Sequence, residues 1–545
     1  MRFLYTFILL IIVKFAVAQI QQGGQPLTIQ HQISTNDIPF LRYHAPDIAI
    51  LEAEDQLNDV VKGRQRIATT IDININFFNH AMKTIIDNQT VYRLAISAKQ
   101  AEALSFSFDN FKLKKGDRFF IFNTNHTQTL GAFTTKNNHK SRQFTTRLIS
   151  GTNIILEYIP GNINQIATIE LNQINYAYRN TGHSIKRNFG DSDYCEVNVN
   201  CSEGDNWQNQ RDATVRILIK EGNDIFWCTG VLVNNTREDC TPYLITAEHC
   251  SLNPRPNDLN QWIFYFNYQS PDCSNPTSEG NLDNNTLTGA MLKAKSNDNG
   301  GDDGSDFLLL ELNDTIPTNY NAYYAGWDIT DNNATSGVSI HHPNGDIKKI
   351  STFTNGATSS SFGGTFLNTH WELKWVSTSN GAGVTELGSS GSPLFNQNKK
   401  LIGTLTGGGA LCNNLQNPDF YGQLAYSWAS NGDSNNRQLQ PWLDPDNTGK
   451  KILNGTAYPC EPREDPENIT VSIFPNPVQD QITIKWDSPA NSSSIRVLDL
   501  LGRELFTINE IQNETSFPFP SMISGMYILE IQLDETKITE KILVL

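Results

Sequence analysis

Three short motifs, far apart in the chain, each place a chemically reactive side chain beside a short apolar run. His249 follows residues 244–247, Asp306 precedes residues 307–312, and Ser390 stands in a glycine-flanked turn. A serine becomes a good nucleophile when a base removes its proton and an acid orients that base. The chain order His, Asp, Ser is one of the orders in which such triads occur. A fold that uses these residues must therefore bring three distant segments to one point.

Each motif has a plainer interpretation when it is taken alone. Gly/Ser loops are common, a histidine beside a strand is often structural, and an aspartate often caps a strand. The three motifs occur together, in the order of a known type of triad and within the length of one domain. This combination favours the catalytic interpretation. We therefore predict Ser390 as the nucleophile, His249 as the general base and Asp306 as the group that fixes the imidazole tautomer.

The length and the first residues of the chain predict an exported protein of several domains. A chain of 545 residues with 38% hydrophobic and 18% charged residues has sequence for more than one core. Residues 1–18 read as a secretory signal peptide, because Arg2 precedes an apolar run and small residues follow at 16–18. Lys14 interrupts that run, which is then too short to span a membrane. The net charge of −16 argues against nucleic acid or an anionic membrane as partner.

Residues 19–187 contain no cysteine and are predicted to form a small β-rich unit. Turns rich in Gly, Asn and Lys separate strand-like runs at 67–77, 90–97, 103–108, 118–123, 129–133, 153–158 and 167–178. The unit follows a signal peptide and ends near the dibasic pair Lys186-Arg187. This position favours a propeptide over the alternative, a binding domain that stays attached.

Residues 188–462 are predicted to form the catalytic domain, and they hold all eight cysteines. An even number of cysteines in an exported domain implies four disulfides, whose pairing the sequence alone leaves open.

The cysteines are scattered and form no Cys-x-x-Cys, which argues against zinc. The neighbours His341 and His342 would point to opposite faces of a strand and make a poor metal pair. The acidic turn at 298–304 lacks the ligand spacing of a calcium loop. We therefore expect neither a metal nor another cofactor.

The strand pattern of this domain predicts an all-β fold. Apolar or alternating runs lie at 215–219, 225–233, 243–246, 261–268, 307–312, 337–341, 371–376, 393–395 and 400–405. A double β-barrel would place His249 and Asp306 on the first barrel and Ser390 on the second, with the triad assembled in the cleft between them.

A composition change after residue 459 marks a linker and a further domain at 463–545. Proline and acidic residues fill 459–466, and short strands are predicted at 469–474, 481–486, 494–498, 526–532 and 537–544. This pattern is typical of a small β-sandwich, for which an Ig-like or carbohydrate-binding module is the generic interpretation. Residues 474–477, 500–503, 524–527 and 541–545 resemble the motifs of the C-terminal type A sorting domain of the Bacteroidetes type IX secretion system.

The catalytic domain resembles the bacterial lysyl endopeptidases of the Achromobacter protease I type, which are chymotrypsin-like serine proteases. The resemblance covers about residues 190–460 and rests on the stretches 228–230, 233–236, 244–250, 267–269, 305–313, 325–328, 340–344, 384–393 and 419–422. It implies the same triad and an oxyanion hole formed by the N–H groups of Gly388 and Ser390. It also implies the disulfides Cys195–Cys412, Cys201–Cys273 and Cys228–Cys250. Cys240 and Cys460 have no counterpart in the family type and are expected to pair with each other.

The same resemblance implies a pocket for a lysine side chain. Trypsin carries its pocket acid six residues before the nucleophile, where this chain has Val384. The lysyl endopeptidases use the aspartate of an Asp-x-Tyr-Gly motif, which is Asp419 here, and the remaining pocket residues are expected to be Thr406, Gly407, Gly408 and Phe362. The family type has a histidine where Thr406 stands and a tryptophan where Phe362 aligns. These two departures could admit arginine beside lysine.

The sequence thus predicts a secreted or cell-surface serine endopeptidase, made as a preproprotein, that cuts after lysine without a cofactor. Its partners would be protein or peptide substrates and, through the C-terminal domain, the type IX secretion machinery. Ser389 carries no charge where trypsinogen-type activation needs an aspartate, so a different activation route is expected. The alternatives are a catalytically weak homologue that acts as a surface adhesin or binding module, and a serine protease with arginine or mixed specificity.

Overall fold

The computed structural model describes residues 23–62, 64, 66–179, 189–277, 279, 285–330, 332–364, 366–458, 471–486, 493–499, 503–509, 514–518, 524–533 and 536–544. The signal peptide, the dibasic pair and the linker predicted from the sequence lie outside these residues. The chain divides into two compact units, Met1–Cys460 and Glu461–Leu545, and each is described by itself. None of the described helices is long and apolar enough to cross a membrane.

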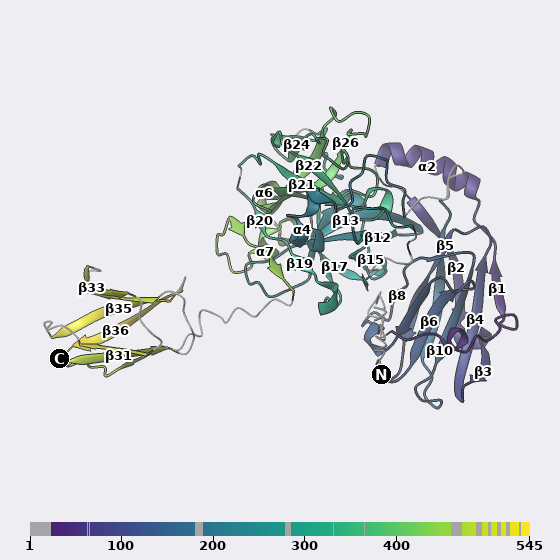
Figure 1. The fold of residues 1–545 in the computed structure, drawn as a ribbon, viewed down its shortest axis with the longest axis horizontal. Helices are drawn as coiled ribbons and strands as arrows, with labels where there is room; N and C mark the ends of the chain where they lie inside the picture. Colours follow the sequence, from purple (N-terminus) through teal and green to yellow (C-terminus); the bar gives the residue numbers. More distant parts are fainter. Residues whose placement is uncertain are drawn as a thin grey trace, which may run out of the picture. The chain divides into compact units, whose positions relative to one another are not determined.

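Residues 23–179, called the pre-domain below, are two β-sheets packed around an aromatic-rich core (Figure 1). One sheet has the order β1-β4-β10-β6-β7, with β3 paired to β4, and the other contains β2, β11 and β5. Alternating apolar residues of both sheets face this core, as expected for a sandwich. The elements are α1 (Leu27–Gln30), β1 (Phe40–Tyr43), α2 (Ile48–Lys62), β2 (Arg66–Asn76), α3 (Phe77–His80), β3 (Met82–Ile86), β4 (Gln89–Ala98), β5 (Ala103–Lys112), β6 (Arg118–Asn123), β7 (Thr129–Phe133), β8 (Phe144–Thr145), β9 (Ile149–Ser150), β10 (Asn153–Ile159) and β11 (Thr168–Ala177).

Residues 189–319 form the first lobe of the predicted catalytic domain. Its strands order as β16-β15-β12-β13, and β14, β18 and β17 continue from β13. The elements are α4 (Gln208–Ala213), β12 (Thr214–Glu221), β13 (Asp224–Leu232), β14 (Tyr243–Ala247), α5 (Pro256–Leu259), β15 (Ile263–Phe266), β16 (Asn285–Thr288), β17 (Ala290–Lys295) and β18 (Phe307–Leu312).

The second lobe is a nine-stranded sheet with the path β22-β21-β25-β26-β27-β24-β23, which β20 and β28 extend. The elements are β19 (Tyr323–Tyr324), β20 (Trp327–Asp328), β21 (Gly337–His341), β22 (Lys349–Phe353), β23 (Thr358–Ser360), β24 (His370–Leu373), β25 (Pro393–Asn396), β26 (Leu401–Gly408), β27 (Asp419–Gln423), α6 (Leu424–Ala429), α7 (Gln440–Leu443), β28 (Ile452–Leu453) and β29 (Thr456–Ala457). A shared apolar core that includes Ile245, Leu309, Phe395 and Leu401 joins the two lobes.

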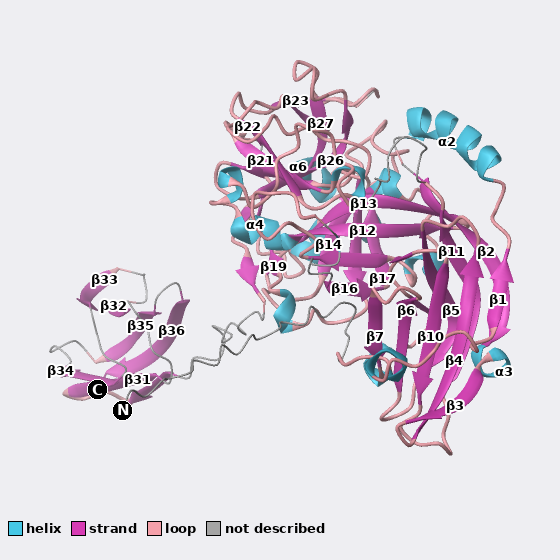
Figure 2. Ribbon diagram, turned by 45° about the vertical axis from the view of Figure 1, so that its right-hand side comes forward, coloured by secondary structure: helices cyan, strands magenta, loops and turns pink. Residues whose placement is uncertain are grey.

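The pre-domain and the first lobe share one sheet (Figure 2). Strand β2 pairs antiparallel with the start of β13, with Thr69 opposite Asp224 and Arg66 opposite Phe226. This pairing joins the two parts into a single twelve-stranded sheet. The sequence predicts separate domains at residues 19–187 and 188–462, and the described residues of both lie in one compact unit.

Between pairs of described cysteines the structure has three disulfides, and they are the three that the family resemblance implies: Cys195–Cys412, Cys201–Cys273 and Cys228–Cys250. The last ties β13 to the turn that follows β14. Cys240 also takes part in a disulfide. Its predicted partner, Cys460, lies outside the described residues.

The C-terminal unit is a small β-sandwich, as its strand pattern predicts. Two sheets, β30-β31-β34 and β33-β32-β35-β36, enclose a core that includes Ile484, Trp486, Leu529 and Ile531. The strands are β30 (Val471–Phe474), β31 (Gln481–Trp486), β32 (Ser493–Leu498), β33 (Glu504–Asn509), β34 (Glu514–Pro518), β35 (Gly525–Leu533) and β36 (Thr536–Val544). Strands β33 and β34 are not predicted from the sequence. They are short, and much of their surface is exposed.

Candidate active site

His249 and Asp306 meet because the strands beside them are neighbours. His249 lies in the short turn that follows β14, and Asp306 directly precedes β18. The two strands pair antiparallel, with Ala247 opposite Phe307, so both residues emerge at the same end of the strand pair. Nδ1 of His249 lies 2.6 Å from Oδ2 of Asp306, and the main-chain N–H of His249 donates to Oδ1 at 2.8 Å. The fully buried carboxylate therefore holds both the ring and the backbone of the histidine.

A second aspartate holds Asp306 in this position. The backbone of Asp306 has a φ of 53°, which is unusual for a residue other than glycine. Its N–H donates to Oδ2 of Asp298 at 2.9 Å. Burial and the neighbouring Glu248 raise the pKa of Asp298 to about 6. The acidic turn at 298–304, predicted only as a turn, thus holds the backbone of Asp306 through Asp298.

Ser390 stands in a turn between the two lobes. The N–H of Thr229 donates to the carbonyl of Ser390 at 2.8 Å, and the N–H of Gly391 donates to Leu405 at 2.8 Å. Gly391 has a φ of 78°, and a Cβ there would lie 2.1 Å from Oγ1 of Thr246. Glycine is therefore required where the turn presses against β13 and β14.

The turn leaves two main-chain donors available beside the serine. The N–H groups of Ser389 and Gly391 donate to Glu386 and Leu405. The described part of the chain provides no acceptor for the N–H groups of Gly388 and Ser390. Gly388 has a φ of 89°, and a Cβ there would lie 3.0 Å from the Gly345 nitrogen and the His342 oxygen. An oxyanion hole requires N–H groups of this kind, which are not already bonded and can donate to the negatively charged oxygen that forms on the substrate.

His249 and Ser390 line one cavity of about 1110 Å³. Ser390 is 7% exposed. No hydrogen bond joins its Oγ to His249 within the described residues. Catalytic hydrogen bonds are often long before a substrate binds, so this separation is compatible with a base and its nucleophile.

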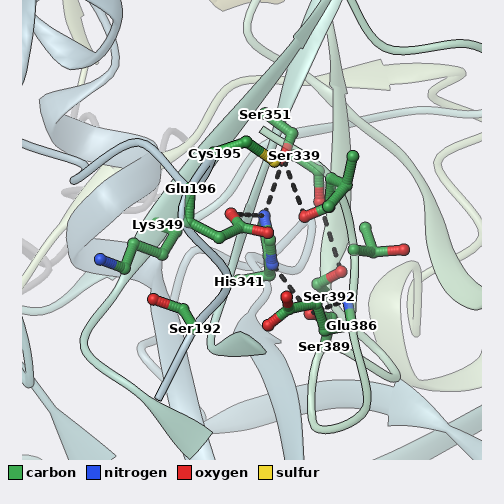
Figure 3. A network of polar contacts seen from close by, with 12 residues as sticks. Ser192, Cys195, Glu196, Ser339, His341, Lys349, Ser351, Glu386, Ser389 and Ser392 are labelled. Atoms are coloured by element: carbon green, nitrogen blue, oxygen red, sulfur yellow. Dashed lines mark hydrogen bonds and ion pairs between the residues drawn. The ribbon is translucent and has the colours of Figure 1, made fainter. Parts of the chain in front are cut away.

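Ser389, next to the predicted nucleophile, is fixed by a buried polar network (Figure 3). Its Oγ lies 2.8 Å from Nδ1 of His341, and the other ring nitrogen lies 2.8 Å from Oγ of Ser351. Burial, assisted by the charge of Lys349, lowers the pKa of His341 to about 3, so this ring is neutral near pH 7. A neutral imidazole therefore supports the turn at the residue before the predicted nucleophile.

Asp419 lies at the start of β27, behind the wall of the same cavity. Its carboxylate accepts hydrogen bonds from Trp375 Nε1 at 2.6 Å, Thr385 Oγ1 at 2.7 Å and the Ala410 N–H at 3.2 Å. The residue is 1% exposed, and its burial raises the pKa of the carboxyl although these hydrogen bonds oppose the shift. A Cβ on Gly408 would lie 2.0 Å from Oδ1 of Asp419, so only glycine lets the wall approach the acid so closely.

The other predicted pocket residues line the cavity, and two of them contact a histidine that the sequence does not predict. Phe362, Thr406, Gly407 and Gly408 are all in the cavity wall. Oγ1 of Thr406 lies 2.9 Å from Nε2 of His370, and the Phe362 ring centroid lies 5.6 Å from that imidazole. Burial lowers the pKa of His370 to about 4, against the opposing effect of Asp306. His370 begins β24, and no sequence spacing connects it with the triad. Trp375 and Thr385 were missed for the same reason.

Comparisons with known proteins find a match for most of the two-lobed domain. Residues 189–422 match the family model described as the lysyl endopeptidase C-terminal domain. These residues are therefore similar to the C-terminal domain of lysyl endopeptidases. A lysyl endopeptidase from Pseudomonas aeruginosa is 31% identical over 234 residues, which are 41% of this chain and 47% of that protein. The chain thus spans about half the length of this relative.

The C-terminal unit also matches a known family. Residues 472–545 match the model of a secretion system C-terminal sorting domain, and this tail marks the chain for secretion or the cell surface. Among solved structures, the thermostable serine protease AL20 from an extremophilic microorganism is 15% identical with a TM-score of 0.27, covering 39% of this chain and 92% of its own. The protease Anisep from Arthrobacter nicotinovorans has the same identity and TM-score, with coverages of 39% and 90%.

Proposed function

We propose that the chain is a secreted serine endopeptidase that hydrolyses peptide bonds after lysine. Ser390 attacks the carbonyl carbon, and His249 takes the serine proton and later gives it to the departing amine. Asp306 keeps the imidazole in the required tautomer, and the N–H groups of Gly388 and Ser390 bind the oxyanion. The observation that carries this proposal is the 2.6 Å contact between His249 Nδ1 and Asp306 Oδ2, together with the cavity that His249 and Ser390 both line.

The specificity for lysine rests on Asp419. A single buried carboxylate suits the compact ammonium of lysine better than the planar guanidinium of arginine, which prefers two parallel hydrogen bonds. Three donors already hold the two oxygens of Asp419, which keeps the carboxylate fixed behind the pocket. Phe362 and Thr406 leave the pocket without the larger aromatic groups of the family type, so we expect lysine to be cut best and arginine second.

Asp419→Asn tests this pocket. We expect kcat/KM on a lysine peptide to fall about 10²- to 10³-fold, the scale of leaving a buried charge without its partner. The amide has almost the same shape as the carboxylate, so the fold should persist. Asp302→Asn is the matched control, because Asp302 lines the same cavity and contacts none of the Asp419 donors. A preference for acidic or apolar residues before the cut bond, or no effect of Asp419→Asn, would refute the assignment.

The same pocket predicts a pH dependence. Burial raises the pKa of Asp419, so its carboxyl becomes protonated at a higher pH than an ordinary aspartate as the solution is acidified. Below that pKa the pocket is neutral and loses its attraction for ammonium. The ratio of kcat/KM for lysine over its uncharged analogue norleucine should therefore decrease as pH falls, and this decrease should be absent in Asp419→Asn.

We also propose that residues 19–187 are a propeptide and that the C-terminal domain serves export by the type IX machinery. The compact unit Glu461–Leu545 is separate from the unit that holds the triad. A chain that ends at Glu464 should therefore keep its kcat/KM on peptides and fail to leave a cell that depends on type IX export. Loss of peptidase activity from the shortened chain would make the tail part of the enzyme.

A further inference from the structure

Among the described residues of the pre-domain, Arg64 is the one that lines the cavity containing His249 and Ser390. Its guanidinium lies 2.5 Å from Oε2 of Glu221 and donates to the carbonyl of Cys250 at 3.3 Å. The guanidinium carbon lies 4.6 Å from the centroid of the Phe226 ring. The side chain is only 9% exposed. Arg64 and Glu221 line the same cavity as His249 and Ser390, so a pre-domain arginine occupies part of the cleft itself.

The site that receives Arg64 is formed by the catalytic domain. Oε1 of Glu221 accepts hydrogen bonds from Ser251 Oγ at 3.1 Å and the Asn253 N–H at 3.3 Å. Both donors follow the catalytic histidine closely in the chain. Burial acts to raise the pKa of Glu221, but Arg64 and these hydrogen bonds outweigh it and the pKa is lowered. The other carboxylate oxygen, Oε2, contacts Arg64 and is therefore the atom that would bind a substrate cation in its place.

Strand β2 runs in the direction expected for the part of a substrate that departs with the amine after cleavage. Strand β13 approaches the nucleophile as it proceeds, because the N–H of Thr229 donates to the carbonyl of Ser390. Strand β2 is antiparallel to β13, so its first residue, Arg66, lies nearest the active site and the rest runs away from it. The part of a substrate that departs with the amine also begins at the cut bond and runs away from the serine. In sequence, Arg64 follows Lys62 by two residues.

We propose that Glu221, Phe226 and the Cys250 carbonyl form a subsite for a basic residue on the leaving side of the substrate, and that Arg64 fills this subsite in the intact chain. The ligand is a guanidinium, or less favourably an ammonium, at the second residue after the cut bond. A guanidinium matches the site because it can bind a carboxylate and a carbonyl together while its flat face covers an aromatic ring. This inference rests on the proposed endopeptidase activity.

The test uses the full chain with Arg64→Ala, which leaves the subsite open whether or not the pre-domain is retained. Two peptides, Ala-Ala-Lys-Gly-Arg-Gln and Ala-Ala-Lys-Gly-Gln-Gln, differ only at the second residue after the lysine. We expect kcat/KM to be about tenfold higher for the arginine peptide, the scale of a charge-assisted hydrogen bond. Adding Glu221→Gln should bring the ratio close to one. An equal ratio with and without Glu221→Gln would overturn the proposal, as would equal kcat/KM values for the two peptides in the Arg64→Ala chain.

Asp224→Asn is the matched control for these measurements. Asp224 lies on the same hairpin as Glu221 and pairs with Arg66 of the pre-domain at 2.9 Å, without contacting Arg64 in the described residues. Its loss removes the same charge and a comparable pre-domain contact, so it should leave the peptide ratio unchanged. A ratio lowered equally by Asp224→Asn would show general electrostatics rather than a subsite, and would overturn the proposal.

A binding measurement separates this inference from the proposed activity. In the Ser390→Ala chain, which should not hydrolyse, titration calorimetry with Gly-Arg-Gln-Ala should show about tenfold tighter binding when Arg64→Ala is added. The corresponding glutamine peptide should show no gain. Equal affinities for both peptides would refute the subsite even if hydrolysis occurs, whereas the gain would support it even if the chain never cuts a peptide.

Discussion

Ser390→Ala should abolish peptide hydrolysis, with a loss in turnover of about 10⁶-fold. The alanine protein has no atom that can attack the substrate carbonyl. Its fold should be unchanged, because no hydrogen bond of the Ser390 hydroxyl is present within the described residues and the surrounding turn is held through its backbone. The measurement is turnover of a lysine peptide together with labelling by an organofluorophosphate, which modifies only an activated serine.

Ser392→Ala is the control for this change. Ser392 is two residues away and fully buried, and its hydroxyl contacts Ser339 rather than His249. That variant should keep both labelling and turnover. Full activity in the Ser390→Ala protein would remove Ser390 from the mechanism and favour a binding role for the domain.

Asp306→Asn should reduce turnover by about 10⁴-fold. The carboxylate accepts from both the ring and the backbone N–H of His249, and it stabilises the positive charge that the imidazole acquires. An amide of the same shape can present its NH₂ group to Nδ1, and the ring then carries its proton on the nitrogen that must act as base. Substrate binding should change little, so the loss should appear in kcat rather than in KM.

Asp298→Asn provides the comparison, since Asp298 contacts the backbone of Asp306 and Gly301 rather than the imidazole. It should reduce turnover far less than Asp306→Asn does. Comparable losses in the two variants would indicate that both substitutions act by disturbing the local structure. The charge of Asp306 would then have no separate effect on the imidazole.

The sequence predicts the triad because each member lies beside a strong local pattern. The apolar runs before His249 and after Asp306 become the paired strands β14 and β18, and that pairing brings the two side chains together. The glycines around Ser390 adopt the positive φ angles that the turn requires. The three described disulfides follow from the family resemblance, since cysteine spacing alone leaves their pairing open.

The features that sequence reasoning missed depend on contacts between distant segments. Helix α2 was not predicted, and nothing in the local pattern of β2 shows that it pairs with β13 across the domain boundary. His370 reaches Thr406 and the vicinity of Asp306 only after β24, β26 and β27 assemble. Asp298 looked like an ordinary turn residue because its partner, the backbone N–H of Asp306, carries no sequence signal.

Digestion of a denatured protein of known sequence, with the new peptide ends read by mass spectrometry, tests the central claim most directly. The claim is that Ser390 cuts peptide bonds after lysine in a pocket that Asp419 defines. We predict new carboxyl ends at lysine above all, a smaller set at arginine, and none in the Ser390→Ala protein. New ends mainly at acidic or apolar residues, or the same peptides from the Ser390→Ala protein, would contradict it.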